Sequence, residues 1–182
     1  MTIYQPAEDS YLLSNTLKDF LNNKNKDIKI LDIGSGSGIQ AKTCKDLGFT
    51  NIITADINQE AIKHLKKQEF KTIQSDLFSN IKSKRKFDLI IFNPPYLPED
   101  KREPKDSKIN TTAGKKGYEI IIKFLKQAKL HLKEKATILL LFSSLSQPNI
   151  IKKQAEQLGY NIKLLDSQKL DFEELFVYEF SL

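Results

Sequence analysis

The stretch Phe87-Asp88-Leu89-Ile90-Ile91-Phe92-Asn93-Pro94-Pro95-Tyr96 is an apolar run that ends abruptly at two prolines. The run is typical of a strand that is buried on both faces, and the prolines cannot continue it because neither has a backbone N–H to donate. Asn93 is therefore a polar side chain at the carboxyl end of a central strand. Open α/β sheets bind ligands outside the carboxyl ends of their strands, so Asn93 is the first candidate functional residue.

Strands and helices alternate along most of the chain. The apolar periodicity predicts strands over residues 28–33, 51–55, 70–74, 87–92 and 136–142, and helices over residues 7–21, 39–47, 59–68, 118–133 and 148–158. Such alternation predicts right-handed parallel crossovers and an α/β protein with a doubly wound sheet. Two extended segments, 161–165 and 175–180, follow with no helix between them. We expect these two to pair antiparallel at one edge of a mostly parallel, seven-stranded sheet.

The composition predicts one globular domain over residues 1–182, because 40% of the residues are hydrophobic and 29% are charged. No apolar stretch approaches the ~20 residues that span a bilayer, and the N-terminal segment lacks the basic and apolar parts of a signal peptide. We therefore expect a cytoplasmic protein with no membrane partner. Cys44 is the one cysteine, which excludes an intrachain disulfide and a Cys-rich metal site. We expect it to be buried on a helix, and no metal is predicted.

The net charge of +6 comes almost wholly from lysine, since Arg85 and Arg102 are the two arginines. Recognition of base edges favours arginine, so a protein that reads DNA sequence is disfavoured. His64 and His131 lie on Lys-flanked helical faces, and we expect both to be solvent-exposed and without a role. Residues 97–116 form a loop of ~20 residues, which is unusually long within a compact domain. Its place directly after Tyr96 favours a substrate lid.

A glycine-rich turn, Gly34-Ser35-Gly36-Ser37-Gly38, lies between the first predicted strand of the sheet and a helix. A turn of this kind lets a ligand approach the backbone closely. The dinucleotide fingerprint fails, because Ile39 stands at the position of its third glycine. Asp32 comes just before the turn, and a carboxylate there is unsuitable for a phosphate. It suits a cationic ligand such as the sulfonium and ammonium groups of S-adenosylmethionine.

Two further acids end the next two strands. Asp56 is placed to accept hydrogen bonds from both ribose hydroxyls of a nucleoside, and Asp76 to accept from an adenine amino group, with Leu77 packed on the ring. Any one of these acids is equally well explained as a solvated strand end. Three acids at three successive strand ends beside one glycine turn favour a nucleoside-type ligand.

The Asn-Pro-Pro-Tyr corner has the groups needed for methyl transfer to a planar amino group. The side-chain oxygen of Asn93 and the backbone carbonyl of Pro94 can accept the two hydrogens of that group, while the prolines fix the corner and offer no competing donor. Tyr96 can stack on the planar target. Catalysis would then be chiefly positioning, because the proton can leave after the methyl group arrives. A simple turn that ends the strand is the alternative, and the glycine turn upstream weighs against it.

These motifs together resemble the HemK-like class I methyltransferases, and within them the archaeal and eukaryotic branch that methylates peptide-chain release factors. The resemblance covers essentially the whole chain. It is carried by Tyr4-Gln5-Pro6-Ala7-Glu8-Asp9-Ser10, by Leu31-Asp32-Ile33-Gly34-Ser35-Gly36-Ser37-Gly38 and by Asn93-Pro94-Pro95-Tyr96. The first of these segments carries the assignment to the branch, since the last is shared with enzymes that methylate the amino groups of DNA and RNA.

The resemblance implies a Rossmann-like class I methyltransferase fold and a reaction. The expected reaction transfers a methyl group from S-adenosylmethionine, leaving S-adenosylhomocysteine, to the side-chain amide nitrogen of the glutamine in the Gly-Gly-Gln motif of a release factor. The catalytic residues would be Asn93, Pro94, Pro95 and Tyr96. The cofactor-binding residues would be Ser10, Asp32, Gly34, Gly36, Gly38, Asp56, Asp76, Leu77 and Asn93.

The resemblance also implies a partner, because relatives in this branch pair with a small zinc-binding activator protein. The strand over residues 70–74 would be an unprotected edge in the usual strand order, which makes it the expected partner site. Two other functions stay open. One is a methyltransferase for RNA or DNA amino groups, at adenine N6 or cytosine N4, which the scarcity of arginine weakens. The other is a non-catalytic scaffold that binds S-adenosylmethionine, which the intact set of acids and Asn93 weakens.

Overall fold

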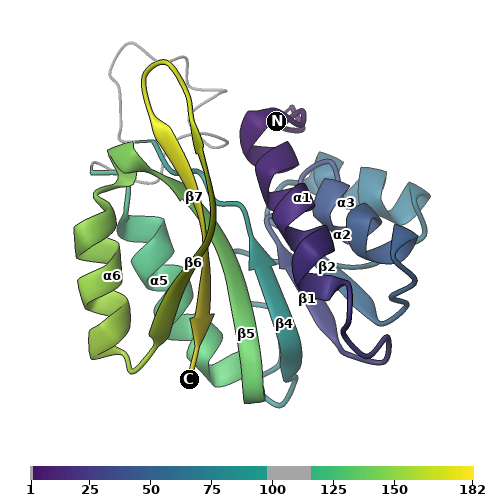
Figure 1. Cartoon of the computed structure of the whole chain (residues 1–182). Coiled ribbons are helices and arrows are strands. Elements are labelled where there is room, and N and C mark those ends of the chain that lie inside the picture. Colours follow the sequence, from purple (N-terminus) through teal and green to yellow (C-terminus); the bar gives the residue numbers. More distant parts are fainter. Residues whose placement is uncertain (1, 98–115) are drawn as a thin grey trace.

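The computed structural model describes residues 2–97 and 116–182, and a seven-stranded sheet runs through the middle of the described chain (Figure 1). The strand order is β3-β2-β1-β4-β5-β7-β6. In chain order, the strands are β1 (Ile30–Ile33), β2 (Ile52–Asp56), β3 (Lys71–Gln74), β4 (Phe87–Phe92), β5 (Leu132–Ser143), β6 (Asn161–Lys169) and β7 (Glu174–Ser181).

The pairing confirms the predicted sheet. β1 pairs in parallel with β2 on one side and with β4 on the other, so the chain reverses its direction of winding between β1 and β4. Ligands of open α/β sheets bind at such a reversal point. β7 lies antiparallel between β5 and β6, as expected for the two C-terminal segments. The fold is therefore α/β with a mostly parallel, doubly wound sheet and an antiparallel edge.

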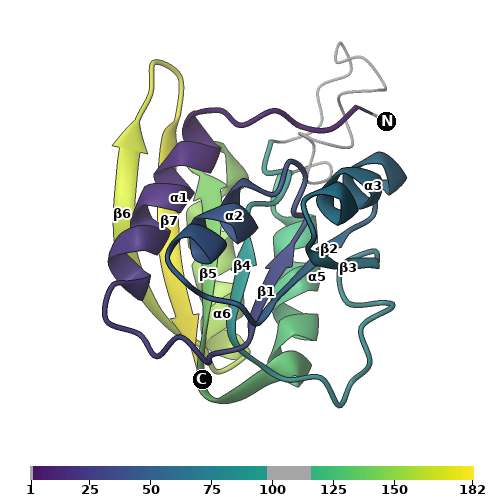
Figure 2. The same ribbon diagram turned by 90° about the vertical axis from the view of Figure 1, so that its right-hand side faces the viewer.

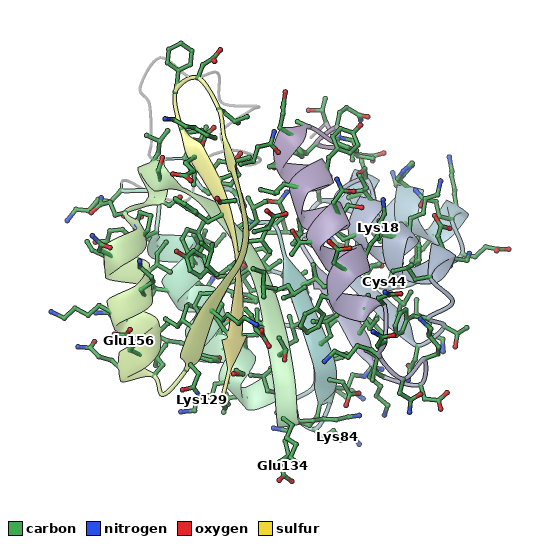
Figure 3. All side chains as sticks on the ribbon, viewed as in Figure 1. Lys18, Cys44, Lys84, Lys129, Glu134 and Glu156 are labelled. Atoms are coloured by element: carbon green, nitrogen blue, oxygen red, sulfur yellow. The ribbon has the colours of Figure 1, made fainter. Side chains whose placement is uncertain are left out.

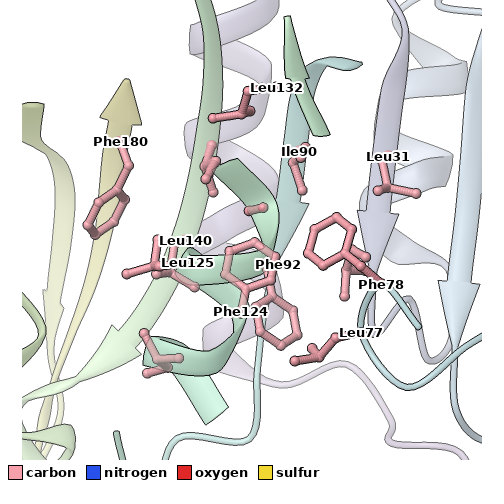
Figure 4. Packing of buried hydrophobic residues seen from close by; sticks show 14 of the residues in the cluster. Leu31, Leu77, Phe78, Ile90, Phe92, Phe124, Leu125, Leu132, Leu140 and Phe180 are labelled. Carbon is pink, nitrogen blue, oxygen red and sulfur yellow. The ribbon is translucent and has the colours of Figure 1, made fainter. Parts of the chain in front are cut away.

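Helices cover both faces of the sheet (Figure 1). On one face lie α1 (Glu8–Leu21), α2 (Ile39–Asp46) and α3 (Gln59–Lys67), and on the other lie α5 (Glu119–Ala128) and α6 (Pro148–Gln157). β4 has apolar side chains on both faces because both are covered. Ile90 and Phe92 pack with the α5 side, where Phe92 and Phe124 have ring centroids 4.4 Å apart (Figure 4). Leu89 and Ile91 pack with the α1 side.

The segment after α5 differs from the prediction. The helix expected over residues 118–133 ends at Ala128, and after the 3₁₀ turn η1 (Lys129–His131) the strand β5 begins at Leu132, four residues before the expected start. Leu132 is buried and pairs with Phe87 of β4, so tertiary pairing overrides the helical periodicity there.

The prediction that His131 is solvent-exposed is wrong. Its side chain is 4% exposed, and its ring stacks on Phe78 with centroids 4.7 Å apart. Nδ1 of His131 lies 3.0 Å from the carbonyl oxygen of Arg85 and donates to it, because a carbonyl can only accept. The predictions for His64, which is exposed, and Cys44, which is buried on α2, are confirmed.

The sheet ends at β3 on one side and at β6 on the other. β3 is the last strand on its side of the sheet within the described ranges, as the sequence predicts.

The substrate lid expected over residues 97–116 lies almost wholly outside the residues that the structure describes. Among the described residues, no helix combines the length and apolar character that crossing a membrane requires.

Candidate active site

A cavity of about 310 Å³ opens at the carboxyl ends of β1, β2 and β4. The N-terminal segment before α1 crosses this end of the sheet and contributes Ile3 and Tyr4 to the lining (Figure 2). All of the predicted site residues except Gly38 line the same cavity: Ser10, Asp32, Gly34, Gly36, Asp56, Asp76, Leu77, Asn93, Pro94, Pro95 and Tyr96.

The glycine turn joins β1 to α2 with three left-handed residues. Gly34, Gly36 and Gly38 have φ angles of +61°, +51° and +84°, a region that other residues rarely adopt. A Cβ atom on Gly34 would lie 3.2 Å from the ring of Phe92, at the entrance to the corner. On Gly38 it would lie 2.8 Å from the side chain of Leu65. Gly38 therefore allows the start of α2 to approach Leu65 of α3 closely, and it does not line the cavity.

Asp56 holds the glycine turn. Its carboxylate accepts hydrogen bonds from the backbone N–H groups of Gly36 (2.8 Å) and Asn58 (2.7 Å). Burial raises the pKa of Asp56, while these backbone donors lower it. The carboxylate thus fixes the shape of the cavity and lines it at the same time.

Three buried oxygen atoms around the cavity have no hydrogen-bond partner within the described chain: Oδ2 of Asp32, Oε1 of Gln40 and Oδ1 of Asn93. All three are acceptors when Asp32 is ionised. Asp32 is 1% exposed, and burial raises its pKa to about 7. Buried acceptors need donors, and a buried carboxylate needs a cation. The cavity therefore fits a ligand that brings N–H groups and positive charge, as the amino-acid part of S-adenosylmethionine does.

The Asn-Pro-Pro-Tyr corner is held from two sides. Nδ2 of Asn93 donates a 2.8 Å hydrogen bond to Oδ2 of Asp9 in the first turn of α1. The backbone carbonyl of Tyr96 accepts a 2.7 Å hydrogen bond from Oγ of Ser146, in the 3₁₀ turn η2 (Ser144–Ser146) after β5. Burial, followed by the nearby charge of Asp9, raises the pKa of Tyr96. The phenol therefore stays protonated and neutral at physiological pH.

Asp76 and Leu77 lie in the turn after β3. Asp76 forms an ion pair with Lys123 of α5 at 2.9 Å, and both side chains are half exposed. Leu77 is buried and has a φ angle of +49°, a strained backbone for a residue with a branched side chain. Strain of this kind is common where a side chain is held against a ligand.

Three residues of the site were not predicted: Asp9, Gln40 and Ser146. From the sequence, Asp9 is explained as an acid that stabilises a helix N-terminus, although it lies in one of the segments that carry the family resemblance. Gln40 lies in a predicted helix, where glutamine usually faces solvent. Ser146 lies 50 residues after Tyr96 in the sequence, and a serine in a turn has no distinguishing sequence signal.

Comparisons with known proteins agree with this geometry. The family model described as "Methyltransferase small domain" matches residues 9–160. A candidate protein N5-glutamine methyltransferase of Methanocaldococcus jannaschii is 37% identical, with 96% of this chain and 89% of that protein covered. A release factor glutamine methyltransferase of Clostridium botulinum is 36% identical over 65% of this chain, which spans 48% of that protein.

A solved structure shows the same fold. The E. cuniculi Mtq2–Trm112 complex is responsible for methylation of the eRF1 translation termination factor. It contains a chain that superposes on this one with a TM-score of 0.80. The two chains are 23% identical, and the superposition covers 100% of this chain and 99% of that one. Sequence motifs, fold and family model thus agree, and the chain belongs to the methyltransferase small domain family.

Proposed function

We propose that the protein transfers a methyl group from S-adenosylmethionine to the side-chain amide nitrogen of the glutamine in the Gly-Gly-Gln motif of a peptide-chain release factor. The observation that carries this proposal is Oδ1 of Asn93, a buried atom in the lining of the cavity that has no hydrogen-bond partner among the described residues. The names of the M. jannaschii and C. botulinum relatives, and the eRF1 substrate of the E. cuniculi complex, support the choice of a glutamine as acceptor.

Residues of the cavity would hold the cofactor in three places. Asp32 and Gln40 present acceptors for an ammonium group, and Asp56 is placed for the ribose hydroxyls. Leu77 offers an apolar surface for the adenine ring. When bound, S-adenosylmethionine supplies an electrophilic methyl group, and S-adenosylhomocysteine is the product.

The corner would orient the acceptor. Oδ1 of Asn93 and the carbonyl of Pro94 can accept the two hydrogens of a glutamine amide, which frees the nitrogen lone pair from conjugation and directs it into the cavity. Tyr96 can stack on the amide plane as a neutral phenol. A strong base is unnecessary, because the amide nitrogen becomes acidic once the methyl group is attached.

The distribution of charge favours a protein substrate over a nucleic acid. The carboxylates of Asp9, Glu173 and Glu8 lie close enough to Tyr96 to raise its pKa further after burial. A second groove has a basic lining that includes Lys84. It lies at the opposite end of the parallel strands from the Asn-Pro-Pro-Tyr corner (Figure 3). A phosphate backbone would therefore meet repulsion at the corner.

We further propose that a small zinc-binding partner protein docks on the open edge of β3. Within the described residues this strand has a strand neighbour on one side only, and such an edge allows addition of a partner strand. The basic groove beside it has both basic and apolar lining residues. The basic ones are Lys29, Lys71, Lys84, Arg85 and Lys86, and the apolar ones are Ile53, Ile73 and Phe87. This surface is complementary to a partner strand with acidic and apolar side chains.

The transfer is tested with labelled S-adenosylmethionine, the partner protein and a release factor. We expect label in the factor with an intact Gly-Gly-Gln motif and none in its Gln-to-Ala version. Label in both would exclude the glutamine, and label in ribosomal RNA alone would favour the nucleic-acid alternative. Asn93→Ala should lower kcat by about 10²–10³-fold while sparing cofactor affinity, because it removes one positioned acceptor. A large loss of cofactor affinity in that variant would assign Asn93 a different main role.

The partner site is tested by charge reversal. We expect Lys71→Glu to weaken the complex on a sizing column and to make it less sensitive to salt. Lys153→Glu, at an exposed position of α6, is the matched control and should leave the complex unchanged. Equal behaviour of the two variants would place the partner elsewhere.

A further inference from the structure

The amide of Asn93 is tied to a residue 84 positions earlier in the chain. Its Nδ2 donates to Oδ2 of Asp9 at 2.8 Å, which links the end of β4 to the first turn of α1. The other amide atom, Oδ1, is buried and has no partner in the described chain. The two atoms of one amide thus face two different environments, a carboxylate and the cavity.

Asp9 is itself held firmly. Its side chain is 3% exposed. Its Oδ1 accepts from the backbone N–H of Ser10 at 2.6 Å, from Oγ of Ser10 at 3.2 Å and from the hydroxyl of Tyr4 at 3.1 Å. These contacts use one carboxylate oxygen and leave the other for Asn93. The position of Oδ2 is therefore set by the N-terminal segment.

This contact fixes which way the amide faces. An asparagine amide has nearly the same shape in its two orientations, which differ by a half-turn that exchanges oxygen and nitrogen. A carboxylate can only accept, so the nitrogen of Asn93 must face Asp9 and the oxygen must face the cavity. After a half-turn, the NH₂ group would point at the incoming amide and repel its hydrogens, and Oδ1 would lie against the Asp9 carboxylate.

We propose that Asp9 is a positioning residue that selects the catalytic orientation of the Asn93 amide. This role rests on the proposed methyl transfer to an amide nitrogen. Asp9 acts through Asn93, and a change at Asp9 that keeps an acceptor oxygen for Ser10 and Tyr4 allows the amide to present the wrong atom. The expected loss therefore falls on kcat.

The first test is Asp9→Asn. The new amide at position 9 can donate to Oδ1 of Asn93 and so stabilise the wrong orientation. We expect kcat to fall by about 10²-fold, with the Kd for S-adenosylmethionine changed by less than about threefold. Asp19→Asn makes the same chemical change at an exposed position of the same helix, and its kcat should match the wild type.

The second test reverses the polarity of the pair. Asn93→Asp alone places two carboxylates in contact and should be nearly inactive. In the double variant Asp9→Asn with Asn93→Asp, the amide at position 9 donates to one carboxylate oxygen and leaves the other as an acceptor for the substrate. We expect the double variant to recover at least about tenfold in kcat over either single variant. Losses that simply add, or a wild-type kcat in Asp9→Asn, would overturn the proposal.

A readout without substrate keeps the proposal testable if a variant does not fold. In the wild-type protein, the Nδ2 hydrogen of Asn93 that is donated to Asp9 should give a nitrogen-edited NMR signal that exchanges slowly with water, because it is bonded to a buried carboxylate. Exchange as fast as that of an exposed asparagine would overturn the proposal. Failure of the wild type to methylate the Gly-Gly-Gln glutamine would instead refute the proposed function, so the two failures are distinguishable.

Discussion

The backbone N–H of Gly36 donates a 2.8 Å hydrogen bond to Oδ2 of Asp56, and this contact joins the turn after β1 to the end of β2. Oδ1 of the same carboxylate accepts from the N–H of Asn58 at the start of α3. One buried side chain therefore holds three segments that surround the cavity. A ligand that contacts Asp56 meets an acceptor whose position is already fixed.

We expect Asp56→Asn to weaken both folding and cofactor binding. The amide keeps one acceptor oxygen, so either the Gly36 or the Asn58 N–H is left without a partner. A buried unpaired donor costs about 1–3 kcal/mol. This corresponds to a melting temperature lower by about 2–12 °C for a chain of this size. Calorimetry should also show a Kd for S-adenosylmethionine about tenfold higher. Asp46→Asn, at an exposed position on α2, is the control, and equal effects of the two changes would contradict this account.

Gly34→Ala should cost stability and cofactor affinity together. Its φ angle of +61° is strained for alanine, and the new Cβ would lie 3.2 Å from the ring of Phe92. The matched control is Gly48→Ala, where φ is +88° and nothing lies within 4 Å of the added Cβ. The left-handed conformation costs either variant about 1–2 kcal/mol in the free energy of unfolding. We expect the Kd for S-adenosylmethionine to rise in Gly34→Ala alone, and an unchanged Kd there would show that the turn tolerates a side chain.

The sequence predicts the sheet and the cavity well because both depend on local patterns. The apolar run before Asn93 is typical of a strand buried on both faces, and two prolines follow it. Asp32, Asp56 and Asp76 lie at or near the carboxyl ends of three parallel strands, and parallel strands bring their carboxyl ends to one side. Asp32, Asp56 and Asn93 therefore converge without any knowledge of side-chain contacts.

The contacts that orient the site could not be predicted, because they join segments distant in sequence. The bond from Asn93 to Asp9 depends on where the first turn of α1 lies relative to the end of β4, and the bond from Ser146 to Tyr96 depends on the turn after β5. The error at His131 has the same origin. Lysines lie two positions away on either side of it, but its ring stacks on Phe78, which lies 53 positions earlier in the sequence.

Binding of S-adenosylmethionine should strengthen as pH rises through about 7. Burial raises the pKa of Asp32 to about 7, so at lower pH the free protein holds a neutral carboxyl group where the cationic ligand needs a carboxylate. Linkage then predicts an affinity that rises by up to tenfold per pH unit below pH 7 and levels off above it. Titration calorimetry between pH 5.5 and 8.5 measures this directly.

Asp32→Asn provides the control for that pH dependence. This variant should bind S-adenosylmethionine weakly. Titration of the ligand's amine affects both proteins equally, so the difference between their two profiles of affinity against pH measures the contribution of Asp32. The stability of the free protein should change in the opposite sense. The folded pKa of Asp32 lies above its ordinary value of about 4, so its stabilising contribution is complete below pH 4 and is lost as pH rises towards 7. Asp32→Asn should therefore unfold at a higher temperature than the wild type at pH 8. Parallel binding profiles for the two proteins would remove Asp32 from the cationic site.

His131→Ala should destabilise the protein without touching the cavity. The change removes a ring that is 4% exposed and stacks on Phe78, and it leaves the carbonyl of Arg85 without its donor. Loss of a buried ring of this size, together with a hydrogen bond, costs about 2–4 kcal/mol in the free energy of unfolding. His131→Phe keeps the stacked ring and should lose about 1–2 kcal/mol, the share of the hydrogen bond. His64→Ala, at an exposed position of α3, should change the free energy of unfolding by no more than about 0.5 kcal/mol. Urea unfolding measures all three. A His131→Ala variant as stable as His64→Ala would mean that this ring contributes nothing to the packing beneath η1.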